Sequence, residues 1–189
     1  ELVGYNTDVY GLLTALSRTA GLDPLPETCV VLGAGGVARA IVYALGMQPG
    51  VREISVLNRT VERAEKLAVD MAKITGKSIL AKPMDAEAQA RSFESAGLVL
   101  NATSLGMHPK VDESPLLDQS AVHPDLVLYD TVFNPLETQL MGQFRERGAQ
   151  AFGGLDMLVY QGARSFTIWT GLEPPADVMK QAVIGRFRT

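Results

Sequence analysis

The sequence predicts an α/β fold built on a doubly wound parallel sheet. Short apolar runs typical of buried strands alternate with amphipathic segments typical of helices between residues 29 and 152. The first apolar run ends in a glycine-rich turn that opens a helix, and a second apolar run follows at the spacing of a strand–helix–strand unit. Together these two observations favour parallel strands with helices on both faces of the sheet.

The elements follow in chain order. A helix is expected at 9–20, with Leu12, Leu13 and Leu16 on one face, and a linker is expected at 21–26. The expected strands are 29–32, 54–57, 78–80, 98–101, 126–130 and about 149–152. The expected helices between the strands are 37–46, 60–74, 86–94 and 136–147.

The last 36 residues break this alternation. After Gly153 and Gly154, the segments 155–170 and 175–186 read as two amphipathic helices with no strand after either of them. We expect these helices to belong to a second structural unit.

Composition narrows the class of protein. The chain has 189 residues, of which 47% are hydrophobic and 20% charged, which suits one globular domain or one domain with pieces of another. Its net charge of −4 argues against nucleic acid as the main partner. No apolar run is long enough to span a membrane, and no signal peptide is visible.

Two further features bear on where the protein works and how much of it is present. The single cysteine, Cys29, lies in an apolar strand and cannot form an internal disulfide, so we expect a buried thiol in a reducing, cytoplasmic compartment. The sequence begins at Glu1 rather than Met, and we therefore expect a fragment or a processed product of a longer chain.

The glycine-rich turn, residues 33–38, has the pattern G-x-G-x-x-A. Gly33 permits a tight turn, Gly35 has no Cβ and so lets the backbone approach a pyrophosphate, and Ala38 is small enough for close helix–sheet packing. Ala34 and Gly36 complete the turn. The helix that starts near Val37 offers free N–H groups and a partial positive charge to phosphates. The turn therefore predicts a Rossmann-like dinucleotide site.

The end of the second strand indicates which nucleotide binds. Asn58, Arg59 and Thr60 stand where an NAD enzyme usually has Asp or Glu, and Glu53 lies at the opposite end of the strand. An arginine there pairs with a 2′-phosphate, whereas a carboxylate would repel it. We therefore predict NADP rather than NAD, with Arg63 as a nearby basic group. A solvated surface charge is the alternative for Arg59, and Thr60 is also placed to cap the next helix.

Polar residues follow other strands at the same edge. Asn101 and Asp130 end two of the predicted strands, as Asn58 ends another, and the glycine turn follows a fourth. Ligands of open parallel sheets bind beyond the carboxyl ends of the strands, so these residues are expected to converge on one site.

Several separated motifs, taken together, resemble the shikimate dehydrogenases. They occur in family order from residue 4 to residue 171, which is far more specific than one motif alone. They are GYNTD at 4–8 followed by Gly11, GAGGVARA at 33–40, NRT at 58–60, NATSLGM at 101–107, DTVFNP at 130–135, GLDMLVYQ at 154–161, Phe166, and WTG at 169–171.

The resemblance implies a two-domain, NADP-dependent oxidoreductase that interconverts 3-dehydroshikimate and shikimate, a step of chorismate and aromatic amino acid biosynthesis. It implies that residues 1–8 end a truncated N-terminal substrate domain, that 9–153 form the NADP-binding domain, and that 154–189 return to the substrate domain. The family pairs a Lys with an Asp at the reacting oxygen. Asp8 matches the Asp, but the Lys lies upstream of this sequence. We therefore expect the 189-residue chain to be inactive by itself.

The resemblance also implies roles for individual residues. Asp8 would be catalytic and would bind substrate with Asn6 and Gln161, while Gly154 and Met157 would line the nicotinamide site. Asn101, Thr103 and Ser104 would line the cofactor cleft. All but Gly154 have a more ordinary alternative: an N-cap cluster for Asn6 and Asp8, a surface amide for Gln161, core filler for Met157, and a polar turn for Asn101, Thr103 and Ser104.

One departure from the family pattern leaves the substrate open. Phe133 stands where the family usually has Tyr, which removes one possible hydrogen bond to substrate. A quinate dehydrogenase remains an alternative, because substrate choice also depends on residues outside this sequence. A glutamyl-tRNA-reductase-like enzyme is another, because it shares the glycine turn and the Asn-Arg-Thr strand end, and a non-catalytic NADP-binding module is a third, because the family's Lys is absent here. His108 and His123 each precede a proline and have no clustered partner, so neither is assigned a catalytic or metal-binding role.

Overall fold

The computed structural model describes residues 2–187 and is centred on a six-stranded parallel sheet. The strand order is β3-β2-β1-β4-β5-β6, so the order reverses between β1 and β4. The strands are β1 (Thr28–Leu32), β2 (Glu53–Asn58), β3 (Ser78–Pro83), β4 (Leu98–Asn101), β5 (Val127–Asp130) and β6 (Gln150–Phe152). Ligand sites of such sheets lie at the point of reversal, beyond the carboxyl ends of the central strands.

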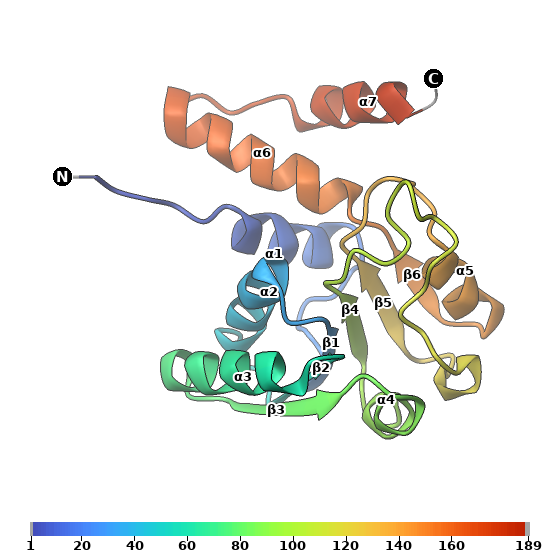
Figure 1. Cartoon of the computed structure of the whole chain (residues 1–189). Helices are drawn as coiled ribbons and strands as arrows, with labels where there is room; N and C mark the ends of the chain where they lie inside the picture. The colour runs from blue at the N-terminus through green and yellow to red at the C-terminus, as the bar shows by residue number, and fades with distance from the viewer. Residues whose placement is uncertain (1, 188–189) are drawn as a thin grey trace.

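Helices cover both faces of the sheet (Figure 1). One face carries α1 (Asp8–Arg18), α2 (Gly36–Gly46) and α3 (Val61–Thr75), and the other carries α4 (Ala86–Phe93), α5 (Gln139–Glu146) and the short 3₁₀ helix η1 (Gln119–Ala121). The predicted doubly wound α/β architecture is confirmed.

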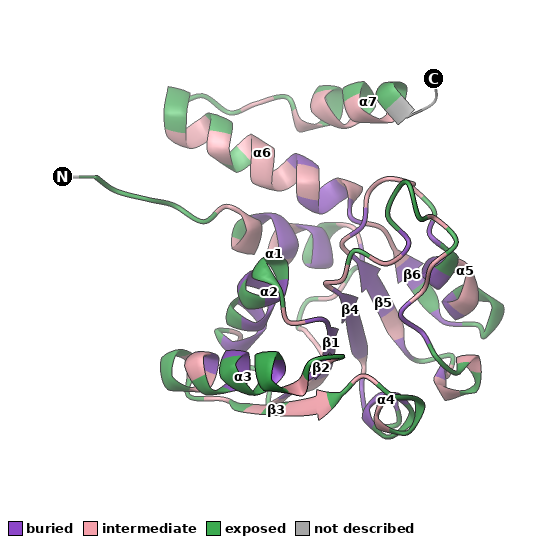
Figure 2. Cartoon of the chain, in the orientation of Figure 1, coloured by how far each residue is buried: buried purple, intermediate pink, exposed green. Residues whose placement is uncertain are grey.

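Successive side chains of β1 point alternately into the hydrophobic cores on the two faces of the sheet. Cys29 and Val31 pack towards α1–α3, whereas Val30 and Leu32 pack towards α4 and α5, and all four are fully buried. Burying one such aliphatic side chain contributes about 1.5–3 kcal/mol, so this strand stabilises both layers of the fold. Figure 2 shows this buried centre within a shell of half-buried and exposed helix faces.

The last two helices lie outside this three-layer sandwich. Helix α6 (Leu155–Thr170) crosses α1, and α7 (Ala176–Phe187) packs on α6, where Lys180 Nζ lies 2.6 Å from Asp156 Oδ1. Large apolar side chains are exposed on the N-terminal segment, near the end of α6 and on α7: Leu2, Val3, Tyr5, Trp169, Leu172 and Val178. Among residues 2–187, no helix is both long enough and apolar enough to cross a membrane.

The observed boundaries correct several local expectations. Helix α5 begins at Gln139 rather than 136, because Thr138 caps it by accepting the Met141 N–H at 3.3 Å and the chain before it is an irregular loop. Thr60 does occupy the N-cap position of α3, but its hydroxyl makes no capping hydrogen bond. Strand β3 runs to Pro83 rather than 80, and η1 had no sequence prediction. Residues 1, 188 and 189 of the two predicted terminal segments lie outside the described residues.

Candidate functional site

The glycine turn joins β1 to α2 at the reversal point of the sheet. Gly33 has φ +103°, and a Cβ there would lie 3.0 Å from the carbonyl oxygen of Ala102, so the turn requires glycine. A Cβ on Gly35 would meet nothing within 4 Å, which leaves open space above the turn. Helix α2 starts at Gly36 without a side-chain cap, and Ala38 is fully buried beneath it. The free N–H groups of this helix end therefore face a space large enough for an anion.

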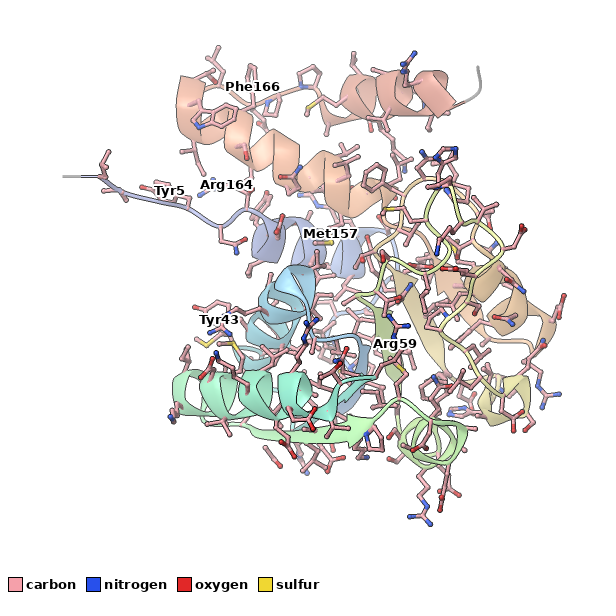
Figure 3. All side chains as sticks on the ribbon, viewed as in Figure 1. Tyr5, Tyr43, Arg59, Met157, Arg164 and Phe166 are labelled. Atoms are coloured by element: carbon pink, nitrogen blue, oxygen red, sulfur yellow. The ribbon has the colours of Figure 1, made fainter. Side chains whose placement is uncertain are left out.

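One cavity of about 240 Å³ lies beside this turn. Its walls are Gly33–Gly35, the end of β2 with Asn58 and Arg59, Met84, the loop 102–105, which includes Thr103 and Ser104, and part of the segment 114–117. The Asn58 amide donates to the Thr60 carbonyl oxygen at 2.8 Å, which shapes the turn that presents Arg59. Figure 3 shows Arg59 at the edge where the strands end.

The basic groups at this rim are not neutralised. Within residues 2–187, neither Arg59 nor Arg63 forms an ion pair, and both residues are exposed. Arg59 lines the cavity, whereas Arg63 and Thr60 do not and stand at the start of α3 next to it. This arrangement suits a phosphate group at the end of β2.

A second cavity, of about 200 Å³, opens on the other side of the first turn of α2. It brings together segments that are far apart in the sequence: Asp8 and Val37 from the first turns of α1 and α2, Thr131 and Phe133 from the loop after β5, and Gly154, Met157, Leu158 and Gln161 from the start of α6. Met157 lies where α6 crosses α1 (Figure 3), and it is only 8% exposed, so it serves both the core and the cavity wall.

Local hydrogen bonds hold the backbone at Asp8 and the side-chain amide of Gln161 in this cavity. Asn6 Oδ1 accepts the Asp8 N–H at 2.9 Å, while Asn6 itself lines a third cavity, of about 550 Å³, together with Gly36. The Thr7 hydroxyl donates to Gln161 Oε1 at 3.2 Å, and Gln161 Nε2 donates to the Leu158 carbonyl at 3.1 Å. The structure thus gathers Asp8 and Gln161 in one cavity and places Asn6 in the lining of another.

The start of α6 is pressed against the loop after β5. The Gly154 N–H donates to the Val132 carbonyl at 2.9 Å, and a Cβ on Gly154 would clash with the Thr131 carbonyl oxygen. Glycine at 154 is therefore needed to seat α6 at the second cavity.

A buried polar network underlies both cavities. Asp130 accepts hydrogen bonds from Asn101 and Thr138, and Asn101 in turn accepts two from Thr103. Burial raises the pKa of Asp130, and its hydrogen bonds to Val132, Thr138 and Asn101 oppose that rise. Asn101 thus supports the cavity wall through Thr103 without lining it.

The sequence predicted that Asp130 would lie with Asn58 and Asn101 at the carboxyl edge of the sheet, but it gave Asp130 no specific task and gave none to Thr131 or Thr138. The one signal for Asp130 is a carboxylate directly after an apolar strand. The contact with Thr138, eight residues further on, is visible only in three dimensions.

The chemistry of the site fits a dinucleotide. The open glycine turn with its helix N-terminus stands between the two cavities, one with an unpaired arginine at its rim and the other with a carboxyl and an amide group. No group of three metal-ligating side chains was found in the part of the chain that the structure describes. His123 Nε2 lies 3.0 Å from the Phe93 carbonyl oxygen, away from both cavities.

Comparison with known proteins identifies the family of the chain. Residues 20–111 match the family model for shikimate / quinate 5-dehydrogenase, and residues 154–184 match that for the shikimate 5′-dehydrogenase C-terminal domain. A shikimate dehydrogenase (NADP(+)) from Methanopyrus kandleri is 41% identical over 188 residues, which cover 100% of this chain and 64% of that protein. The chain therefore spans under two thirds of the length of this relative.

Solved structures of the same family superpose on this chain. A shikimate 5-dehydrogenase from Listeria monocytogenes, solved with shikimate and NAD, superposes with a TM-score of 0.88 at 33% identity, covering 95% of this chain and 63% of that one. A quinate dehydrogenase from Corynebacterium glutamicum, solved with NAD, superposes with a TM-score of 0.85 at 30% identity, covering 96% and 63%. With motifs, family models and whole-chain superpositions in agreement, the chain belongs to the shikimate/quinate dehydrogenase family.

Proposed function

We propose that this chain is the nucleotide-binding portion of an NADP-dependent shikimate dehydrogenase, which interconverts 3-dehydroshikimate and shikimate. The observation that carries the proposal is Arg59 at the end of β2, which has no ion-pair partner among residues 2–187 and lines a cavity next to the open glycine turn after β1. Bound NADP would supply the hydride chemistry, and the protein would supply binding, orientation and control of the proton.

The cofactor would be held by residues already in place. The turn formed by Gly33, Ala34, Gly35, Gly36, Val37 and Ala38 would bind the pyrophosphate, and Asn58, Arg59, Thr60 and Arg63 would bind the 2′-phosphate. Thr103 and Ser104, supported by Asn101, would line the cleft, and Gly154 with Met157 would line the nicotinamide end. Support comes from the division of most of these residues between the two cavities.

Asp8 and Gln161 would act on the substrate. When a ketone is reduced, its oxygen gains negative charge, and a nearby acid–base pair stabilises that oxygen and moves the proton. Asp8 would do so together with a lysine from outside these 189 residues, as in the rest of the family. Gln161 would orient the substrate hydroxyls through its amide, and Asn6 would hold the segment that carries Asp8.

The rest of the catalytic unit is also a proposal. Residues 1–8 would end a substrate domain, 9–153 would form the NADP domain, and 154–189 would return to the substrate domain. The exposed apolar side chains on the N-terminal segment and on α6–α7 support a covering domain from the same parent chain. We further propose a cytoplasmic location, supported by the unpaired Cys29.

Quinate is the second candidate substrate. It is favoured by Phe133, which lines the second cavity without offering a hydroxyl, and by the superposition on a quinate dehydrogenase.

Parallel calorimetric titrations with NADP⁺ and NAD⁺ test the cofactor assignment. We expect tighter binding of NADP⁺, because only NADP⁺ carries the 2′-phosphate that Arg59 can pair with. A preference for NAD⁺ would contradict this assignment and favour a quinate-type enzyme. The substrate is then assigned by comparing turnover of shikimate and quinate in a protein with a complete substrate domain. Robust turnover by the 189 residues alone would show that no further lysine is needed.

A further inference from the structure

The two cavities have separate linings but share one polar support beneath them. Thr103, in the loop after β4, lines the first cavity, and Thr131 and Phe133, in the loop after β5, line the second. Strands β4 and β5 are neighbours, and Asn101 and Asp130 stand opposite each other at their ends. Both loops therefore start from this pair of residues.

The carboxylate of Asp130 is the centre of the support. Its Oδ1 accepts the Asn101 Nδ2–H at 2.9 Å and the Val132 N–H at 3.0 Å, and its Oδ2 accepts the Thr138 hydroxyl at 2.7 Å. Asp130 is fully buried and lines neither cavity. An ionisable group at such a place is costly to bury, and an apolar residue would be the more stable choice if packing were its only role.

The network reaches the first cavity through Asn101. Since the Asn101 amide nitrogen donates to Asp130, its oxygen must face the other way, towards Thr103. That oxygen accepts the Thr103 N–H at 3.0 Å and the Thr103 hydroxyl at 2.7 Å, and Thr103 Oγ1 accepts the Leu105 N–H at 3.2 Å. The carboxylate thus orients the amide that shapes the loop.

The network reaches the second cavity through the backbone. The bond from the Val132 N–H to Asp130 fixes the chain between Thr131 and Phe133. The Thr131 hydroxyl donates to the Asn101 carbonyl at 2.8 Å, which ties the second loop back to the first strand.

We propose that Asp130 is a positioning residue that holds the rims of both cavities in register, so that a dinucleotide spanning them meets both rims at once. The inference rests on the proposed function, because it takes the ligand to be a dinucleotide. It assigns Asp130 no contact with that ligand and no part in proton transfer.

The first test is Asp130→Asn, which keeps the shape but removes the charge and reverses one hydrogen bond to Thr138. We expect calorimetry to show about a tenfold loss of NADP⁺ affinity, since hydrogen bonds to a charged group are the stronger kind. Adenosine 2′,5′-bisphosphate carries only the part of the nucleotide proposed for the first cavity, so its affinity should fall by less than about threefold. A general loss of folded protein would weaken both ligands equally.

Thr138 provides a second test that leaves Asp130 and both cavity walls unchanged. Thr138→Val removes the donor to Asp130 and should weaken NADP⁺ more than the bisphosphate, whereas Thr138→Ser keeps the donor and should restore binding. Thr138→Val also removes the N-cap of α5. Asp85→Ala is the matched control, because it removes the N-cap of α4, where Asp85 Oδ1 accepts the Ala88 N–H at 2.7 Å, away from the network. It should lower the melting temperature without changing the ratio of the two affinities.

Three results would overturn the inference. Unchanged NADP⁺ affinity in Asp130→Asn and Thr138→Val, an equal loss for both ligands in these variants, or no rescue by Thr138→Ser would each show that the network does not align the rims. If Asp130→Asn fails to fold, the inference is tested by comparing Thr138→Val with Thr138→Ser. Absence of NADP⁺ and NAD⁺ binding in the unsubstituted chain would instead contradict the proposed function itself, and this inference with it.

Discussion

At the scale of single residues, the proposed preference for NADP rests on one guanidinium group, that of Arg59. Arg59 lines the first cavity and has no ion-pair partner among the described residues. The last residue of β2, Asn58, is neutral, so it does not repel a 2′-phosphate as Asp or Glu at that position would.

Arg59→Asp should reverse this electrostatic preference. We expect about 100-fold weaker NADP⁺ binding and less than about threefold weaker NAD⁺ binding, because an attraction to the 2′-phosphate becomes a repulsion. Titration calorimetry with both nucleotides measures the change. Arg52→Asp is the matched control: it makes the same change of charge next to the opposite end of β2, where Arg52 pairs with Glu27 at 3.2 Å. Equal losses for both nucleotides in Arg59→Asp would contradict the 2′-phosphate assignment.

At the scale of elements, the crossing of α1 and α6 brings Asp8 and Gln161 into one cavity. The crossing is close because α1 has a glycine at the contact: a Cβ on Gly11 would lie 2.7 Å from the Met157 carbonyl oxygen and 2.8 Å from Gln161 Cβ. Both contacts involve parts of α6 that cannot move without the helix.

Gly11→Ala should therefore destabilise the chain. We expect a loss of about 1–3 kcal/mol in the free energy of unfolding, because overpacking outweighs the gain in helix propensity. Gly142→Ala is the control within α5, where a Cβ would meet nothing within 4 Å, and it should stabilise by about 0.5–1 kcal/mol. Urea denaturation of both variants gives the two values. A stabilised Gly11→Ala would show that α1 and α6 are not in close contact.

At the scale of the whole molecule, Cys29 reports on the stability of the central sheet. It is the only cysteine of the chain, it is fully buried in β1, and burial raises its pKa to about 12. The thiolate, which is the reactive form, is therefore rare at neutral pH in the folded chain.

Labelling of Cys29 by a disulfide reagent at pH 8 should be slow and should follow global unfolding, whereas the denatured chain should react at once. Because the thiol loses its proton more easily in the unfolded state, the stability linked to this group is complete below about pH 9 and is lost as the pH rises towards 12. Thermal melts across that range, compared with a Cys29→Ala variant, measure the difference. Fast labelling at pH 8 under native conditions would show that β1 opens locally.

The sequence by itself determined the framework of this protein and much of the chemistry proposed for it. The strands and the central parts of most helices could be predicted, because apolar runs and the spacing of apolar residues are local properties of the sequence. The predicted helix 155–170, for example, coincides with α6. The glycine turn and the sequence Asn58-Arg59 follow from chemistry that adjacent residues carry together. Family resemblance added Asp8 and Gln161, whose roles remain proposals.

Only the tertiary structure decided which distant residues meet. It brings Asp8, Gln161 and Met157 together in one cavity, whereas Asn6 lines another. It also joins Asp130 to Thr138 and Asn101 by hydrogen bonds. The start of α5 also depended on Thr138, whose hydroxyl both caps the helix and donates to Asp130. These features come from contacts between segments brought together by sheet order and helix crossing, and neither is encoded in a local pattern of side chains.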